Sequence, residues 1–107
     1  MTTSVFITTR FEGFHCWPEA PEQVSFLRDM HRHVFHVRLE VEVGHQDRDV
    51  EFILLKRDVD SYIEKIRKTP VTDTWSCETW ASVLLEQFQA MSVEVSEDGE
   101  NGAVCRR

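Results

Sequence analysis

The sequence lacks several features that would place it in a specialised class. It has only three cysteines, Cys16, Cys77 and Cys105, which are far apart and form no CxxC pair. An odd, scattered set predicts no disulfide framework and fits reduced thiols in a cytoplasmic protein. No hydrophobic run approaches the length of a membrane span, and the N-terminus has no basic region followed by an apolar one. We therefore expect no signal peptide and no membrane anchor.

Positive charge is also scarce. Twelve Lys and Arg residues face nineteen Asp and Glu residues, which gives a net charge of −7. Proteins that bind nucleic acid neutralise its phosphates with clustered Lys and Arg, so nucleic acid is not an expected partner. At 107 residues the chain has room for one hydrophobic core and is expected to form a single domain, 1–107.

The first half of the chain predicts two strands. Residues 3–15 are rich in β-branched and aromatic side chains, and residues 33–43 alternate between apolar and polar positions. Residues 16–30 hold two prolines and predict a loop with a short helical turn near residues 22–27.

The second half predicts two helices and then a hairpin. Residues 51–68 have helical apolar spacing, and Ser76 is a candidate N-cap for a second helix. Residues 91–96 and 103–107 predict strands around a turn at 97–102. The order β-β-α-α-β-β predicts an α+β fold, with a four-stranded antiparallel sheet and two helices on one face. Its two open edges would be protected by pairing with neighbouring subunits.

The histidines form the most unusual local pattern. His31 and His33 are two apart in a strand, so both rings point to the same side, whereas His36 points to the other. His15 ends the strand expected to pair with them and is the candidate third ligand of an open, catalytic-type zinc site. The alternative is that these histidines are simply the polar end of a strand. Imidazole also suits copper, iron and nickel, so the residue type does not fix the metal.

Five segments follow one another in the order of the expected elements: "FEGFHCW", "HRHVFHV", "VEFILLK", "SCETWA" and "VSEDGENGAV". In turn they resemble the motifs "F-x-A-x-H", "HGHNYxV", "(M)DFxxLK", "PTxENxA" and "VxET" of the 6-pyruvoyl-tetrahydropterin synthase and 6-carboxy-tetrahydropterin synthase family, which has the tunnelling fold. The resemblance runs along nearly the whole chain.

The resemblance implies a site built from two kinds of residue. His15, His31 and His33 would bind Zn²⁺, and Glu97 would accept hydrogen bonds from the guanidine-like edge of a pterin. Glu78 would line the same pocket. Without the resemblance, Glu97 would be interpreted as an acidic residue in a solvent-exposed turn. Glu78 then reads as an acid that favours the dipole of a helix N-terminus.

The resemblance also implies an activity and an assembly. Family members convert dihydroneopterin triphosphate, eliminating triphosphate or cleaving the side chain, in biopterin-type or 7-deazaguanine (queuosine) pathways. The metal polarises the side-chain oxygens of the substrate and so acidifies a neighbouring C–H bond. Trimers stack into a hexameric barrel with pockets between subunits, so a homo-oligomer is expected.

The chain departs from the family where protons are transferred. The family's cysteine corresponds to Leu27, and the "DHxxLN" segment that supplies an Asp–His pair is missing. The middle Gly of "HGH" is Arg32, and the Asp before Phe is Glu51. Cys77, or failing that Cys16, is the candidate replacement, because a metal or a helix N-terminus can lower the pKa of a thiol.

The sequence therefore leaves three functions open. The first is a zinc-dependent lyase acting on a pterin with altered catalytic residues. The second is a catalytically inactive module that binds a pterin or a purine-like nucleotide. The third is a small structural oligomer whose histidines bind nothing. The third is disfavoured, because a decaying site has no reason to retain three separated histidines and both acids.

Overall fold

The computed structural model describes residues 1–107 and has an α+β fold with one four-stranded antiparallel sheet, in the order β1-β2-β3-β4. Its elements are β1 (Thr3–His15), β2 (His31–Val43), α1 (Phe52–Ile66), α2 (Cys77–Gln87), β3 (Ser92–Glu97) and β4 (Asn101–Arg106). Two short 3-10 helices, Glu22–Arg28 and Pro70–Thr74, lie in the connections. The predicted element order and the α+β class with a four-stranded antiparallel sheet are confirmed. No helix is long and apolar enough to cross a membrane.

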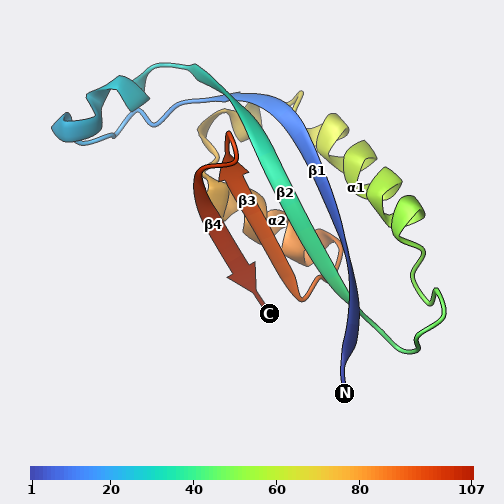
Figure 1. Cartoon of the computed structure of the whole chain (residues 1–107). Coiled ribbons are helices and arrows are strands. Elements are labelled where there is room, and N and C mark those ends of the chain that lie inside the picture. The colour runs from blue at the N-terminus through green and yellow to red at the C-terminus, as the bar shows by residue number, and fades with distance from the viewer.

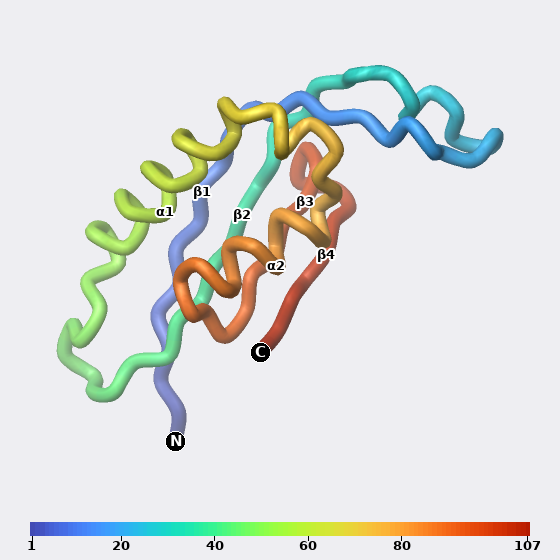
Figure 2. Tube along the Cα trace, turned by 180° about the vertical axis from the view of Figure 1, so that it is seen from behind, coloured from blue at the N-terminus to red at the C-terminus, as the bar shows by residue number.

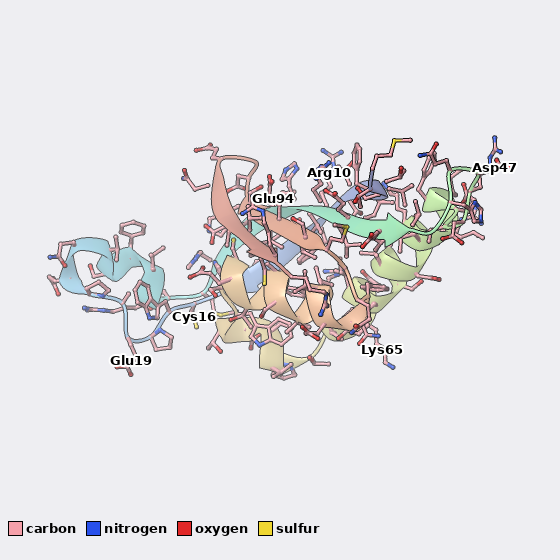
Figure 3. The ribbon with its side chains drawn as sticks, turned by 90° about the horizontal axis from the view of Figure 1, so that it is seen from below. Arg10, Cys16, Glu19, Asp47, Lys65 and Glu94 are labelled. Carbon is pink, nitrogen blue, oxygen red and sulfur yellow. The ribbon has the colours of Figure 1, made fainter.

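The two helices cover one face of the sheet and enclose the core. Figure 2 shows α1 running along β1 while α2 lies over β3 and β4. The alternation in β2 places one set of its side chains against the helices, as predicted. The most deeply buried core residues are Phe35, Leu39, Val59, Leu84, Val93 and Val95. The opposite face is polar, and Figure 3 shows Arg10 and Glu94 on the side of the sheet away from α2.

Three predicted boundaries need correction. The second strand begins at His31, two residues before the predicted start, because the pairing with β1 continues to the end of both strands. The turn predicted at 97–102 contains only residues 98–100, because Glu97 and Asn101 pair across it. The first helix ends at Ile66, and its N-terminal residue follows Glu51, whose side chain caps the Leu54 amide. The predicted N-cap Ser76 is confirmed, since its side chain accepts a hydrogen bond from the Thr79 amide at 3.1 Å.

Residues 16–30, here called the arm, project beyond the sheet together with the adjoining ends of β1 and β2 (Figure 1). The arm is closed by a hydrogen bond from the Trp17 amide to the Leu27 carbonyl and by another from Arg28 to the Ala20 carbonyl. At its base, the Cys16 amide donates to the Asp73 carbonyl at 2.8 Å. The first two bonds hold the arm together, and the third joins its base to the segment that precedes α2.

The β3–β4 hairpin turns on two residues in the left-handed region. Asp98 has φ of 57° and Gly99 has φ of 74°, as a type I′ turn requires. The backbone of β3 then approaches Gly102 very closely. A Cβ atom at that position would lie 2.0 Å from the Val95 carbonyl oxygen, so no larger residue fits without moving one of the two strands.

We therefore expect Gly102→Ala to destabilise the protein by about 1–3 kcal/mol, the usual cost of forcing an extra group into a packed site. Urea unfolding followed by circular dichroism measures this change. Gly44→Ala is the matched control. The nearest neighbour of its Cβ is a single side-chain oxygen at 3.3 Å, and a shift within ~0.5 kcal/mol is expected. Equal stability of the two variants would show that the hairpin tolerates the added methyl group.

Candidate metal centre and its pocket

The register between β1 and β2 brings three histidines together. His15 lies directly opposite His31, and His33 lies opposite Gly13. One nitrogen of each ring lies within 4.8 Å of one nitrogen of the other two. The ring centroids are 4.5 Å apart for His15 and His31, 5.0 Å for His31 and His33, and 5.3 Å for His15 and His33. The predicted set therefore converges, and His36 lies outside it.

Phe35 supports this cluster from the core. It is only 1% exposed, and its ring centroid lies 5.3 Å from that of His15 and 6.0 Å from that of His33. The ring fits there because Gly13 has no side chain, since a Cβ atom on Gly13 would lie 2.8 Å from Phe35 Cε2. The histidines are thus the polar end of the face that carries the hydrophobic core.

Each histidine is held through its Nδ1 atom. The Nδ1 atom of His15 lies 2.8 Å from the Trp75 carbonyl, and that of His31 lies 2.8 Å from the Asp29 carbonyl. The His33 Nδ1 lies 2.7 Å from Asp98 Oδ2. Carbonyls and carboxylates only accept hydrogen bonds, so these partners assign the ring proton to Nδ1 and leave a lone pair on each Nε2. This is the arrangement typical of metal-binding histidines.

Asp98 is a residue of the candidate site that the sequence did not single out. Its carboxylate accepts hydrogen bonds from His33 and from the Val34 amide at 2.9 Å, while its own amide donates to the Val34 carbonyl at 2.7 Å. The Val34 amide and then His33 lower the pKa of this carboxyl group. The Asp-Gly pair signalled a turn, but nothing local indicated that the turn would reach the end of β2.

Glu97 lies beside the histidine cluster. Its Oε2 atom is 3.2 Å from His33 Nε2, and its Oε1 atom is 3.5 Å from His15 Nε2. His33 Nε2 is buried and has no hydrogen-bond partner. A buried polar nitrogen without a partner costs free energy, so the residues present fit a bound cation well.

A cavity of about 450 Å³ opens next to this cluster. The predicted site residues that line it are His15, His31, Glu97, Glu78 and Cys77, whereas His33 is in the histidine cluster but not in the cavity lining. Its apolar walls come from Trp17, Leu27 and Trp75. Leu27 and Trp17 belong to the arm. On another side of the cavity, Cys77 and the acidic Glu78 lie at the N-terminus of α2.

Cys77 is placed at this cavity but is not activated. Burial first, and then the negative charges of Glu97 and Glu78, raise its pKa to about 12. Its Sγ lies 3.9 Å from Glu97 Oε1, to which the thiol donates. With no cation bound, the surrounding residues therefore favour the protonated thiol, the opposite of the lowering on which a catalytic thiolate depends. Cys16 also lines the cavity, at the base of the arm (Figure 3).

No model of a known protein family matches the chain, and no curated protein is similar enough to it to count as a relative.

The raised pKa predicts unequal thiol reactivity. With a pKa of about 12, roughly one Cys77 side chain in ten thousand is a thiolate at pH 8, and only the thiolate reacts. In a disulfide-exchange assay on the native protein, we expect two thiols to react quickly and the third only after unfolding. Cys77→Ser should remove the slow thiol and leave the two fast ones. Rapid reaction of three thiols in the native wild type would contradict the assigned protonation state.

Proposed function

We propose that this chain binds a divalent metal ion, zinc in the first instance, through His15, His31 and His33, and recognises a pterin- or purine-like heterocycle in the adjacent cavity. The observation that carries the proposal is the convergence of three imidazoles whose Nδ1 atoms all have acceptors. The resemblance to the 6-pyruvoyl-tetrahydropterin synthase family supports the same reading. When bound, the metal would act as a Lewis acid on an oxygen of the ligand.

The cavity has the chemistry that such a heterocycle needs. Its volume of about 450 Å³ lies in the range of small-molecule sites. Trp17 and Trp75 offer aromatic surface for a planar ring. Glu78 and Glu97 offer carboxylate oxygens, which pair with adjacent N–H donors such as those of a guanidine-like edge. Pterins and guanine both present that edge, so the two ligand classes share one recognition chemistry.

Binding without turnover is the function that the site supports best. Lyase chemistry needs a group that removes a proton from carbon, and Cys77 is held protonated while Leu27 fills the position of the family's cysteine. The cavity is also lined by no Lys or Arg, so this chain offers no cation there for a triphosphate. The lyase is kept as the second candidate, because a heterocycle in the cavity would lie directly beside His15 and His31.

A homo-oligomer, a trimer or hexamer, belongs to the same proposal. β1 and β4 are both open edges of the sheet. The arm also exposes large apolar side chains, with Trp17, Phe26 and Met30 each about half exposed or more. Exposed apolar surface beside an unpaired strand is typical of a protein interface.

The metal site is tested with single histidine variants. We expect wild type to bind one Zn²⁺ per chain, and His31→Ala and His33→Ala each to bind it at least about tenfold more weakly, because each loses one ligand. Elemental analysis after dialysis against limiting zinc measures this. His45→Ala is the control, since His45 is exposed and outside the cluster. Equal zinc content in all four proteins would refute the site.

The ligand is tested by calorimetry on the zinc-loaded protein, with neopterin and guanosine as probes and adenosine as the negative probe. We expect Glu78→Gln to weaken binding by roughly 10-fold or more, the cost of a charge-assisted hydrogen bond. Glu19→Gln, on the exposed surface of the arm, should bind as wild type does (Figure 3). Failure of wild type to bind either probe would refute heterocycle recognition. Turnover of dihydroneopterin triphosphate, detected by mass spectrometry, would favour the lyase.

A further inference from the structure

We infer that Glu97 is a fourth protein ligand, so that the metal centre, in the absence of a heterocycle, is a closed site of three histidines and one carboxylate. The inference rests on the proposed metal site and changes the role of Glu97. Sequence resemblance assigns this residue to the heterocycle, whereas its position in the structure is beside two of the three metal-binding nitrogens.

The first argument is the separation between donor atoms. Zinc binds imidazole nitrogen and carboxylate oxygen at about 2.0–2.2 Å, so two such ligands at a tetrahedral angle lie roughly 3.3 Å apart. The two oxygens of Glu97 lie 3.2 Å and 3.5 Å from the Nε2 atoms of His33 and His15. Each distance matches the separation between two ligands of one ion, but a different oxygen of Glu97 approaches each histidine. Glu97 lies outside the group of ligand atoms that are all within 4.8 Å of one another, so binding the same ion requires a movement of its side chain.

The second argument is electrostatic. The acceptors on Nδ1 leave each Nε2 with a lone pair, and a carboxylate facing two lone pairs at this range is repelled unless a positive charge lies between them. A proton on Nε2 would also supply a positive charge, and its most stable arrangement is an aligned hydrogen bond to the carboxylate. His33 Nε2 makes no such bond, although Glu97 Oε2 is 3.2 Å away. A cation placed among the three groups satisfies all of them at once.

The third argument is that Glu97 is held in place. It is the last residue of β3 and pairs with both Phe35 and Asn101. The next residue, Asp98, is bonded to the end of β2 through its carboxylate and its amide. Residues on a paired strand hold a ligand geometry more closely than residues on a free loop. The same hairpin thus presents one direct ligand, Glu97, and the partner that orients His33.

A closed centre changes how a heterocycle is recognised. A carboxylate committed to a metal ion does not offer both oxygens to two N–H groups. The heterocycle is then held by Glu78, or it displaces Glu97 from the metal. In either case the ligand-free site resembles a structural metal centre, with four protein ligands, more closely than an open catalytic one.

The experiment compares metal affinity in two carboxylate variants. Metal-free protein is titrated with Zn²⁺ against a chromophoric chelator, and with Co²⁺ to follow its visible absorption. We expect Glu97→Gln to lose affinity by about 100-fold or more, beyond the 10- to 100-fold typical of groups that only orient a ligand. Glu94→Gln should bind as wild type does. Glu94 lies on the same strand as Glu97 but on the opposite face.

The outcomes separate this inference from the metal site itself. Wild-type affinity and an unchanged Co²⁺ spectrum in Glu97→Gln would overturn the fourth ligand and leave the three histidines standing. Absence of metal binding by wild type would overturn both. Circular dichroism of each metal-free variant shows whether it folds. Should Glu97→Gln not fold, Glu97→Asp takes its place, and wild-type affinity with an unchanged Co²⁺ spectrum in that variant would overturn the fourth ligand.

Discussion

The register between β1 and β2 is the constraint on which the rest of the structure depends. Thirteen consecutive pairs run from Thr3 opposite Val43 to His15 opposite His31. A shift of one residue would turn every side chain of one strand to the other face. Such a shift would turn the charged side chains of that strand toward the core and would separate the histidines. The hydrophobic face of β2 also carries the histidine cluster, so the burial that stabilises Phe35 and Leu39 also fixes the direction of His31 and His33.

The second constraint is the β3–β4 hairpin, whose turn contacts the histidine cluster from the β2 side that does not pair with β1. Where the hydrophobic core ends, polar groups are half-buried, and each needs a partner to offset its lost hydration. Asp98 supplies partners to His33 and to the backbone of Val34, while backbone carbonyls do so for His15 and His31. Neighbouring positions of the hairpin therefore have different roles: Glu97 faces the histidine cluster, Asp98 holds the His33 ring, and Gly99 adopts the positive φ of the turn.

Most of the fold could be predicted, because it follows from local periodicity. Alternation along residues 33–43 and helical spacing along 51–68 gave the right elements, and strand parity with hairpin pairing placed His15 beside His31. The hydrogen-bond partners of the histidines could not be predicted. Two are backbone carbonyls, of Trp75 and Asp29, which carry no sequence signal. The state of Cys77 was also out of reach, because its pKa depends on burial and on a carboxylate twenty residues away.

The charges at the site limit which ligand it can hold. With the proposed divalent ion bound, its charge and those of Glu97 and Glu78 would sum to zero, so the cavity would have no excess positive charge with which to hold an anion. Placing a triphosphate there would leave several negative charges unpaired in a partly desolvated space, which is costly. A neutral heterocycle or nucleoside meets no such penalty. If the chain does act on a triphosphate, the cations must come from outside this cavity. A second copy of the chain bound at an open sheet edge is the assembly that could supply them.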